Sequence, residues 1–148
     1  YQGLQEYQTP VEYGKSEILH RGERIAVLGV GSMIPSCEEI CRGLREDGYN
    51  PTFVNARFVK PLDVELLDEL AKDHSLFVTV EENVKSGGYG EHVSAYMEAC
   101  HPETRVLSAA VWDRFVPQGN VDSLRNRIGL GAEDIRQAIE DSEELKGQ

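Results

Sequence analysis

The sequence predicts an α/β fold in which a parallel or mostly parallel sheet is covered by helices on both faces. Short apolar runs of the kind that form buried strands alternate along the chain with segments of helical periodicity. Turns rich in glycine, proline or asparagine separate these segments. With 148 residues, of which 40% are hydrophobic, the chain can build the core of one domain without disulfide or metal cross-links.

The first β-α unit lies between residues 24 and 48. After Arg24, the run 25–31 is nearly all apolar and is closed by glycines, which favours a strand buried on both faces. Pro35 is compatible with a helix start, and Ser36 with Glu39 forms a capping-box pattern. Gly48 is expected to end the helix. The apolar residues between them follow the i, i+3, i+4, i+7 rule: Cys37, Ile40, Cys41 and Leu44.

The remaining strands are predicted from short apolar runs bounded by turn residues. The buried ones are 52–54, 76–80 and 105–111, and the segment 16–19 could add an edge strand. Because each buried run is followed by a helical segment, we expect crossover connections and parallel pairing.

Three more helices are predicted where apolar residues recur at helical spacing. The first follows a turn that ends at Pro61, with Asp63 as a helix-start residue, and the second follows a glycine-rich loop. The third closes the chain from Ile128 onward. The apolar positions of the three helices are Leu62, Leu66, Leu67 and Leu70; Val93, Tyr96, Met97 and Cys100; and Ile135, Ala138 and Ile139.

Charge and cysteine content limit the partners and the environment. The formal charge of -11 would repel a phosphate backbone and an anionic lipid surface, so we expect no nucleic-acid partner and no membrane partner. The sequence has no apolar run near the ~20 residues that span a bilayer and no basic-then-apolar leader. Cys37 and Cys41 would share one helix face, which indicates reduced thiols rather than a disulfide framework. We therefore expect a cytoplasmic protein.

The opening stretch is expected to be a linker. Residues 1–13 are polar and aromatic, contain Pro10 and follow neither regular period. The expected organisation is an interdomain linker tail at 1–13 and a single domain at 14–148. A first residue Tyr1 rather than Met favours a fragment of a longer protein.

Functional groups in open α/β sheets gather on the loops beyond the carboxyl ends of the strands. The first such loop, 29–32, holds only part of a dinucleotide fingerprint, because Ile34 stands where the third glycine belongs, and we interpret it as a structural turn. The second loop places Arg57 and Lys60 close together in an otherwise acidic chain. This pair could hold a carboxylate or a phosphate; equally, Arg57 could bond a carboxylate or carbonyls of its own fold.

Two adjacent carboxylates and three glycines mark the third loop, 81–90. Glu81 and Glu82 could act as acid-base groups, or one could turn inward to hold amides while the other is solvated. We favour the second interpretation, since no nucleophile or metal-ligand set accompanies them, and strand alternation makes them face opposite ways. His92 opens a helix beside this loop and is the one histidine of interest. The other candidate contact residues here are Asn83, Gly87, Gly88 and Gly90.

The fourth loop, 112–119, mixes aromatic, charged and turn residues, as contact surfaces do. Asp113, Arg114 and Phe115 are its candidate interface residues; alternatively, Asp113 pairs with Arg114 or Arg57 and Phe115 fills the core. The histidines show no paired ligand spacing, and no nucleophile elbow or Cys/His dyad is present. We therefore predict no catalytic, cofactor-binding or metal-binding residue in this chain, which would be a binding or assembly domain.

Five motifs, in order, resemble one enzyme family. They are V-L-G-V-G-S-M, N-A-R-F-V-K-P-L-D, V-T-V-E-E-N with G-G-Y-G, W-D-R-F-V-P-Q-G and I-G-L. This succession resembles the C-terminal domain of 1-deoxy-D-xylulose-5-phosphate synthase, of the transketolase superfamily, from about Gly14 to the closing helix. The string from Arg57 to Asp63 favours this synthase over a transketolase or the β-subunit of a 2-oxo acid dehydrogenase. A freestanding regulatory or assembly module is the alternative from another class.

The resemblance implies both a fold and a role. The fold would be transketolase C-terminal-domain-like, a three-layer α/β/α sandwich with a five-stranded mixed sheet, mostly parallel with one antiparallel edge strand. The full enzyme would convert pyruvate and D-glyceraldehyde 3-phosphate into 1-deoxy-D-xylulose 5-phosphate and carbon dioxide. Its thiamine diphosphate and Mg would be held by the missing N-terminal and middle domains, since the family's Gly-Asp-Gly motif is absent here. This domain would pack against the middle domain, help to form a homodimer, and be inactive alone.

Overall fold

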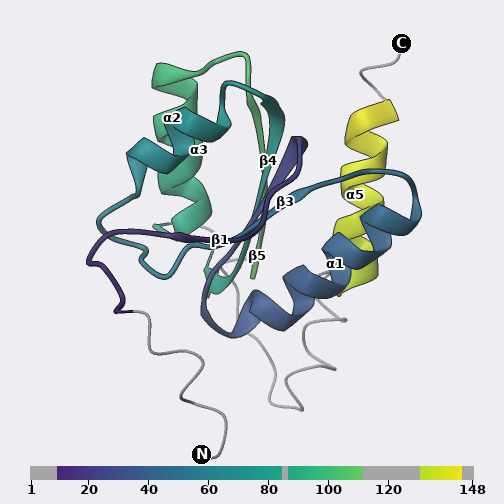
Figure 1. Cartoon of the computed structure of the whole chain (residues 1–148), viewed down its shortest axis with the longest axis horizontal. Helices are drawn as coiled ribbons and strands as arrows, with labels where there is room; N and C mark the ends of the chain where they lie inside the picture. Colours follow the sequence, from purple (N-terminus) through teal and green to yellow (C-terminus); the bar gives the residue numbers. More distant parts are fainter. Residues whose placement is uncertain (1–9, 85–86, 112–130, 145–148) are drawn as a thin grey trace, which may run out of the picture.

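The computed structural model describes residues 10–84, 87–111 and 131–144, and its centre is a five-stranded sheet in the order β1-β3-β2-β4-β5 (Figure 1). The edge strand β1 pairs antiparallel with β3, whereas β2 pairs in parallel with β3 and β4, and β4 in parallel with β5. The predicted mixed sheet with one antiparallel edge strand is confirmed. The strands are β1 (Glu17–His20), β2 (Arg24–Gly29), β3 (Thr52–Asn55), β4 (His74–Val84) and β5 (Arg105–Val111).

Helices cover both faces of the sheet, so the fold has three layers. Two helices, α2 and α3, lie on one face, and α1 and α5 lie on the other (Figure 1). This confirms the predicted α/β/α sandwich. In the described parts of the chain, no helix is both long and apolar enough to cross a membrane. The helices are α1 (Ile34–Glu46), α2 (Val64–Leu70), α3 (Tyr89–Cys100) and α5 (Ala132–Glu144), and a 3-10 turn, η2 (Gly31–Met33), precedes α1.

Side-chain alternation along β2 divides the core into two halves. Ile25 and Val27 pack on the side of α1 and α5, whereas Ala26 and Leu28 pack on the side of α2 and α3. All four are at most 1% exposed, as expected of a central parallel strand that is covered on both faces. The apolar run that predicted this strand is therefore explained by burial on both sides.

The start of α1 differs from the prediction. The capping box of Ser36 and Glu39 is wrong, because the helix already begins at Ile34 and its N-cap residue, Met33, makes no side-chain hydrogen bond. The 3-10 turn leads directly into the helix, so the chain needs no polar cap at position 36. Pro35 falls in the first turn, where its missing N–H costs nothing.

The predicted start of α2 is confirmed at one position and shifted at another. Asp63 is the N-cap residue, and its Oδ1 accepts the N–H of Leu66 at 3.3 Å. Leu62 therefore precedes the helix instead of lying on it, because the capping carboxylate fixes the first helical residue at Val64.

The end of β4 also differs from the prediction, which assigned residues from Glu81 onward to a loop. The strand continues to Val84, and this residue still pairs with Val111 of β5 after an irregularity beyond Val80. The two adjacent carboxylates thus lie on a strand. Strand geometry, rather than loop geometry, decides where their side chains point.

Cys37 and Cys41 lie on the buried face of α1, as the helical spacing predicted. All three cysteines of the chain are free, and only Cys100 is exposed. Burial raises the pKa of both the Cys37 thiol and the Cys41 thiol to about 12. Neither is a nucleophile at neutral pH, because the reactive form is the thiolate.

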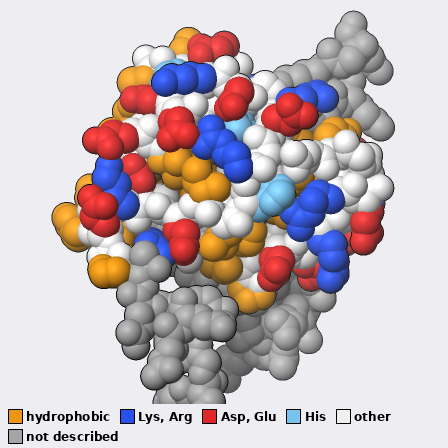
Figure 2. All heavy atoms as spheres, in the orientation of Figure 1, with side chains coloured by type: hydrophobic (Ala, Val, Ile, Leu, Met, Phe, Trp, Pro, Cys, Tyr) orange, Lys and Arg blue, Asp and Glu red, His pale blue; other side chains and the backbone are white. Residues whose placement is uncertain are grey.

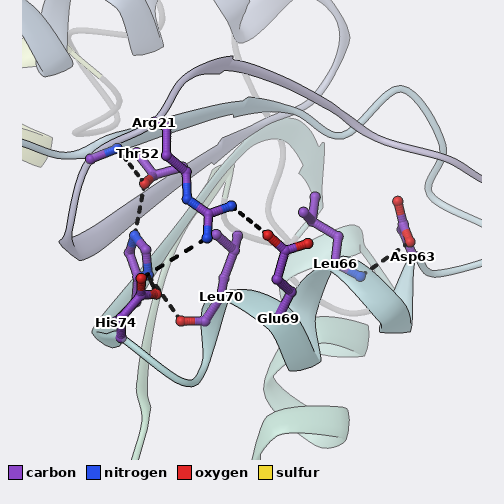
Figure 3. A network of polar contacts seen from close by, with 9 residues as sticks. Arg21, Thr52, Asp63, Leu66, Glu69, Leu70 and His74 are labelled. Carbon is purple, nitrogen blue, oxygen red and sulfur yellow. Dashed lines mark hydrogen bonds and ion pairs between the residues drawn. The ribbon is translucent and has the colours of Figure 1, made fainter.

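A buried histidine joins several segments at the edge of the sheet where the parallel strands begin (Figure 3). The Nδ1 atom of His74 lies 2.9 Å from the carbonyl oxygen of Leu70 and 2.6 Å from Asp73 Oδ1. Its Nε2 lies 2.7 Å from Thr52 Oγ1, which also accepts the Gly22 N–H at 2.8 Å. Because both neighbours of Nδ1 are acceptors, Nδ1 carries a proton, and the Thr52 hydroxyl can donate to Nε2.

Arg21 closes over this network from the end of β1 (Figure 3). Its Nη1 lies 2.6 Å from Glu69 Oε1, and its Nη2 lies 3.9 Å from Asp73 Oδ2. The His74 side chain beneath has no exposed surface. Contacts within the domain therefore hold this edge, which we call the amino edge (residues 21–24, 50–52 and 69–74).

Candidate interdomain surface

The loops that follow the central strands meet at the opposite edge of the sheet. Gly29 lies beside Asn55 on one side and beside Val80 on the other, so these three strands end at the same level. We call this the carboxyl edge (residues 30–33, 56–63, 81–84 and 87–90). Three of the four predicted candidate loops therefore come together. The candidates of the fourth loop lie outside the described residues: Asp113, Arg114 and Phe115.

Glu81 turns inward and holds the start of α3. The residue is 1% exposed; its Oε2 accepts the Tyr89 N–H at 2.7 Å, and its Oε1 accepts the Gly90 N–H at 2.9 Å. These amides belong to the first turn of α3, where backbone N–H groups have no acceptor within the helix. The positive end of the helix dipole also favours a carboxylate at this position. Of the two interpretations of the paired glutamates, the structure contains the amide-holding one, with Glu81 as the inward residue.

Two glycines allow this close approach of backbone and side chains. A Cβ on Gly88 would lie 2.5 Å from Glu81 Oε1, and a Cβ on Gly90 would lie 2.6 Å from both Thr79 Oγ1 and Ser108 Oγ. Neither position can accept a side chain unless its neighbours move. Gly87 has a φ of +77°, and its N–H donates to the Glu91 carboxylate. Residues 87–90 thus pack closely against other residues of the same domain.

Glu82 points away from the core and is exposed. Its carboxylate accepts a hydrogen bond from the hydroxyl of Ser32, which links the end of β4 to η2. Asn83 is the next residue of β4. His92 lies in the first turn of α3, and its half-buried ring leaves Nδ1 without a hydrogen-bond partner among the described residues.

Arg57 is paired within the fold. Its Nη2 lies 2.6 Å from Glu17 Oε2, and the Arg57 side chain is only 21% exposed. The backbone of Arg57 has a φ of +58°, and its N–H donates to the side-chain oxygen of Asn55 at 3.1 Å, as in an Asx turn. Of the two alternatives for Arg57, the partner seen is a carboxylate of its own chain. Lys60 is exposed on the same connection.

The contacts that fix the N-terminal segment to the carboxyl edge could not be predicted from the sequence. The Ser16 N–H donates to Asp63 Oδ2 at 2.7 Å, and the Ser16 hydroxyl donates to the Ala56 carbonyl at 3.1 Å. The ring of Tyr13 meets that of Phe58 edge-on, with centroids 5.5 Å apart. No period in the sequence identifies such contacts. The only signal was the suggestion of an edge strand at 16–19.

The chemistry available at this edge is limited. Burial raises the pKa of Tyr89, and the nearby carboxylates of Asp63 and Glu81 raise it further, so its phenol remains protonated. Within the described residues, no three His, Cys, Asp or Glu side chains are arranged to hold a metal ion.

The fold defines a class of protein, an α/β/α sandwich domain with a mixed five-stranded sheet. The described carboxyl-edge groups are occupied in fixing the domain's own loops: Glu81 holds backbone amides and Arg57 holds Glu17. These contacts fix the backbone of the loops at this edge.

The comparison with known families agrees with this class. A family model described as the C-terminal domain of transketolase matches residues 14–135, and the chain belongs to that family. The chain is also 40% identical over 136 residues to a 1-deoxy-D-xylulose-5-phosphate synthase from Lachnoclostridium phytofermentans and 39% identical over 137 residues to one from Dictyoglomus thermophilum. These matches cover 91% and 93% of this chain but only 22% of either relative. The chain thus spans about a fifth of the length of these relatives.

Solved structures show the same fold. A split-gene transketolase described as an inactive β4 tetramer matches with a TM-score of 0.79 at 28% identity, over 90% of this chain and 43% of that one. A transketolase mutant from Pichia stipitis matches with a TM-score of 0.62 at 15% identity, over 84% of this chain and 17% of that one. The second likeness supports the fold alone.

Proposed function

We propose that this chain is the C-terminal domain of a 1-deoxy-D-xylulose-5-phosphate synthase and that it serves domain packing and homodimer assembly. The full-length enzyme would convert pyruvate and D-glyceraldehyde 3-phosphate into 1-deoxy-D-xylulose 5-phosphate and carbon dioxide. The observation that carries the proposal is the name shared by the relatives at 40%, 39% and 42% identity, each matched over at least 81% of this chain.

The share of each relative that is matched supports a role as one domain of a larger enzyme. The matched part is 19% to 22% of these relatives, so most of such a protein would lie outside this chain. Thiamine diphosphate and Mg²⁺ would be bound by those other domains, and when bound the cofactor would supply the carbanion chemistry. In this arrangement residues 1–13 would link the domain, residues 14–148, to the domain before it, in the cytoplasm.

The role of the carboxyl edge in this proposal is positional. Glu81 fixes the first turn of α3, and Arg57 fixes β1, so the loops they hold present a defined surface to a neighbouring domain or subunit. The wider set assigned to this surface keeps the sequence candidates: Arg57, Lys60, Glu81, Glu82, Asn83, Gly87, Gly88, Gly90, His92, Asp113, Arg114 and Phe115.

We further propose that the isolated chain is inactive. The related split-gene transketolase chain, of which the match covers 43%, is described as inactive in its β4 tetramer, which supports this expectation. That chain also gives a second candidate function, a transketolase, at 28% identity. The two functions differ in the donor substrate, which would be pyruvate for the synthase and a ketose phosphate for the transketolase.

The test uses two proteins, the full-length gene product and the chain of 148 residues. Each is titrated calorimetrically with thiamine diphosphate and Mg²⁺ and assayed with glyceraldehyde 3-phosphate and either pyruvate or fructose 6-phosphate. We expect the full-length protein to bind the cofactor and to use pyruvate, and the short chain to do neither. Use of fructose 6-phosphate in place of pyruvate would favour the transketolase. Cofactor binding by the short chain would contradict the packing role.

A further inference from the structure

We propose that an exposed apolar surface beside β1 is the docking site for the part of the same polypeptide that precedes this domain. This inference rests on the proposed function, because it requires the longer enzyme. It adds a contact surface that the carboxyl-edge candidates do not include. We call it the β1 surface, and it consists of Val11, Tyr13, Ile18, Leu19 and Val64.

The five residues of this surface are the exposed large hydrophobic side chains among the described residues. Tyr13 is 77% exposed and Val11 60%, and the three others are between 36% and 45% exposed. Single exposed apolar residues are ordinary, whereas a group of them rimmed by charges is typical of an interface. Figure 2 shows hydrophobic side chains at the left of the view, on the side where Figure 1 draws the N-terminal segment.

The N-terminal segment is fixed in place, so its exposed side chains are presented by an ordered backbone. Lys15 pairs with Glu65 and lies 3.9 Å from Asp63, the two neighbours of Val64. Gly14 fits closely against Pro61, whose Cγ would be 2.9 Å from a Cβ at that position. These contacts bring the chain around Tyr13 beside the first turn of α2. Tyr13 and Val64, which are distant in sequence, thus lie on neighbouring segments.

The geometry of β1 favours an occupant that packs on side chains over one that adds a strand. In the described sheet β1 has β3 as its only partner, so its outer edge is open. The register shifts between Ile18 and His20, which leaves Leu19 as an extra residue at this edge. Such irregularities interrupt the ladder that a further strand would need. A second copy of the chain joined edge to edge is therefore disfavoured.

We infer that the preceding part of the polypeptide docks on the β1 surface, because it is covalently linked to this domain. The relatives are about five times as long as the matched part, and the family is the C-terminal part of transketolase. A domain linked through residues 10–13 would be held within reach of the β1 surface. Because covalent linkage makes docking intramolecular, a modest apolar patch is sufficient to hold it.

The test measures thiol accessibility at the β1 surface in the full-length enzyme. Tyr13→Cys and Val64→Cys are placed one at a time in a Cys100→Ser background, since Cys100 is exposed. Ala95→Cys, at an exposed position of α3, is the matched control. Each protein is pulsed with a maleimide, and labelling at each position is read by peptide mass spectrometry over a range of protein concentrations.

We expect labelling at positions 13 and 64 to be at least about tenfold slower than at position 95, and unchanged on dilution. Rapid labelling at both positions would overturn the inference, because the surface would then be uncovered. Protection that is lost on dilution would also overturn it, in favour of a second copy as the occupant. The same samples are assayed for product from pyruvate. A protected surface without product would refute the proposed function alone, and product with rapid labelling would refute this inference alone.

Discussion

Each edge of the sheet contains a buried ionisable side chain, and the two edges satisfy its hydrogen bonds in different ways. At the amino edge, His74 is satisfied by Thr52 and by the Leu70 carbonyl, and Arg21 pairs with the neighbouring Asp73 and with Glu69. At the carboxyl edge, the oxygens of Glu81 are satisfied by two backbone amides of α3. The first arrangement joins elements to one another, whereas the second fixes the path of a glycine-rich segment.

Both edges carry exposed charged side chains, but among the described residues an exposed tyrosine, Tyr13, lies beside the carboxyl edge alone. At the amino edge, Arg21 forms ion pairs with Glu69 and Asp73. The carboxyl edge has Glu82 and Lys60 exposed, and Tyr13 lies beside it against Phe58. Variants of the amino edge should therefore affect folding alone, and variants of the carboxyl edge should also affect assembly.

The largest effect is expected for Glu81→Ala. This change leaves the amides of Tyr89 and Gly90 without partners in a buried site, and should lower the free energy of unfolding of the chain by about 3 kcal/mol. Glu81→Gln should cost less, because its amide oxygen can still accept one of the two bonds. Denaturant titration measures both. Two results would contradict the role of Glu81 in holding these amides. They are an equal loss of unfolding free energy in the two variants, and a loss below about 1 kcal/mol in the alanine variant.

Gly90→Ala should have the next largest effect, a loss of about 2 kcal/mol in the free energy of unfolding. The added methyl group would lie 2.6 Å from the hydroxyl oxygens of Thr79 and Ser108. The matched control is Gly43→Ala on α1, where a Cβ meets the flexible side chain of Arg136 at 2.9 Å. We expect the control to be neutral or stabilising, because alanine favours the helix. Similar losses in both variants would count against the close fit at Gly90.

Thr52→Val tests the amino edge. The valine removes the oxygen that accepts the Gly22 N–H and contacts His74 Nε2, and should cost about 1.5 kcal/mol of unfolding free energy. In the full-length enzyme, turnover below the melting temperature should not change. Ser36→Ala, at the position where a cap was wrongly predicted, should stay within about 0.5 kcal/mol of the parent. A fall in turnover with Thr52→Val would show that the two edges are not separable in function.

The smallest effect is expected for Asp68→Asn, and it depends on pH. The hydrogen bond from His101, with a further one from Tyr96, lowers the pKa of Asp68 below 3.8. A carboxyl whose folded pKa is depressed contributes stability above its unfolded pKa, near 3.9, and loses it as the pH falls through the folded value. The stability difference between parent and variant should therefore be present at pH 6 and shrink below about pH 4. A difference that does not change with pH would contradict this assignment.

Much of the fold could be predicted because buried strands and helices have regular patterns of apolar residues in the sequence. The run 25–29 is apolar at successive positions because β2 is covered on both faces, and β5 was predicted with its observed bounds, Arg105–Val111. The start of α1 could not be predicted, because a 3-10 turn replaces the polar cap that Ser36 seemed to offer. Local propensity is a weak guide where the preceding turn sets the helix start.

The candidate surface was predicted in part. Strand alternation showed that Glu81 and Glu82 face opposite ways, but the inward residue is decided by contacts with residues eight and nine positions ahead. The β1 surface was not predicted, because its members lie in segments without a period and meet only through Lys15 and the residues around Val64. Such long-range contacts have no signature in a single sequence.

The most direct test of the packing role is Glu82→Ala in the full-length enzyme. Glu82 is exposed at the carboxyl edge, and its carboxylate contacts Ser32, so the variant should leave the fold of this domain intact. Melting temperature, dimer dissociation and turnover are measured on the same preparation. We expect weaker dimerisation or a lower melting temperature, with turnover of the remaining dimer unchanged. Unchanged melting and dimerisation with a large fall in turnover would contradict the packing role and would place Glu82 in the chemical step.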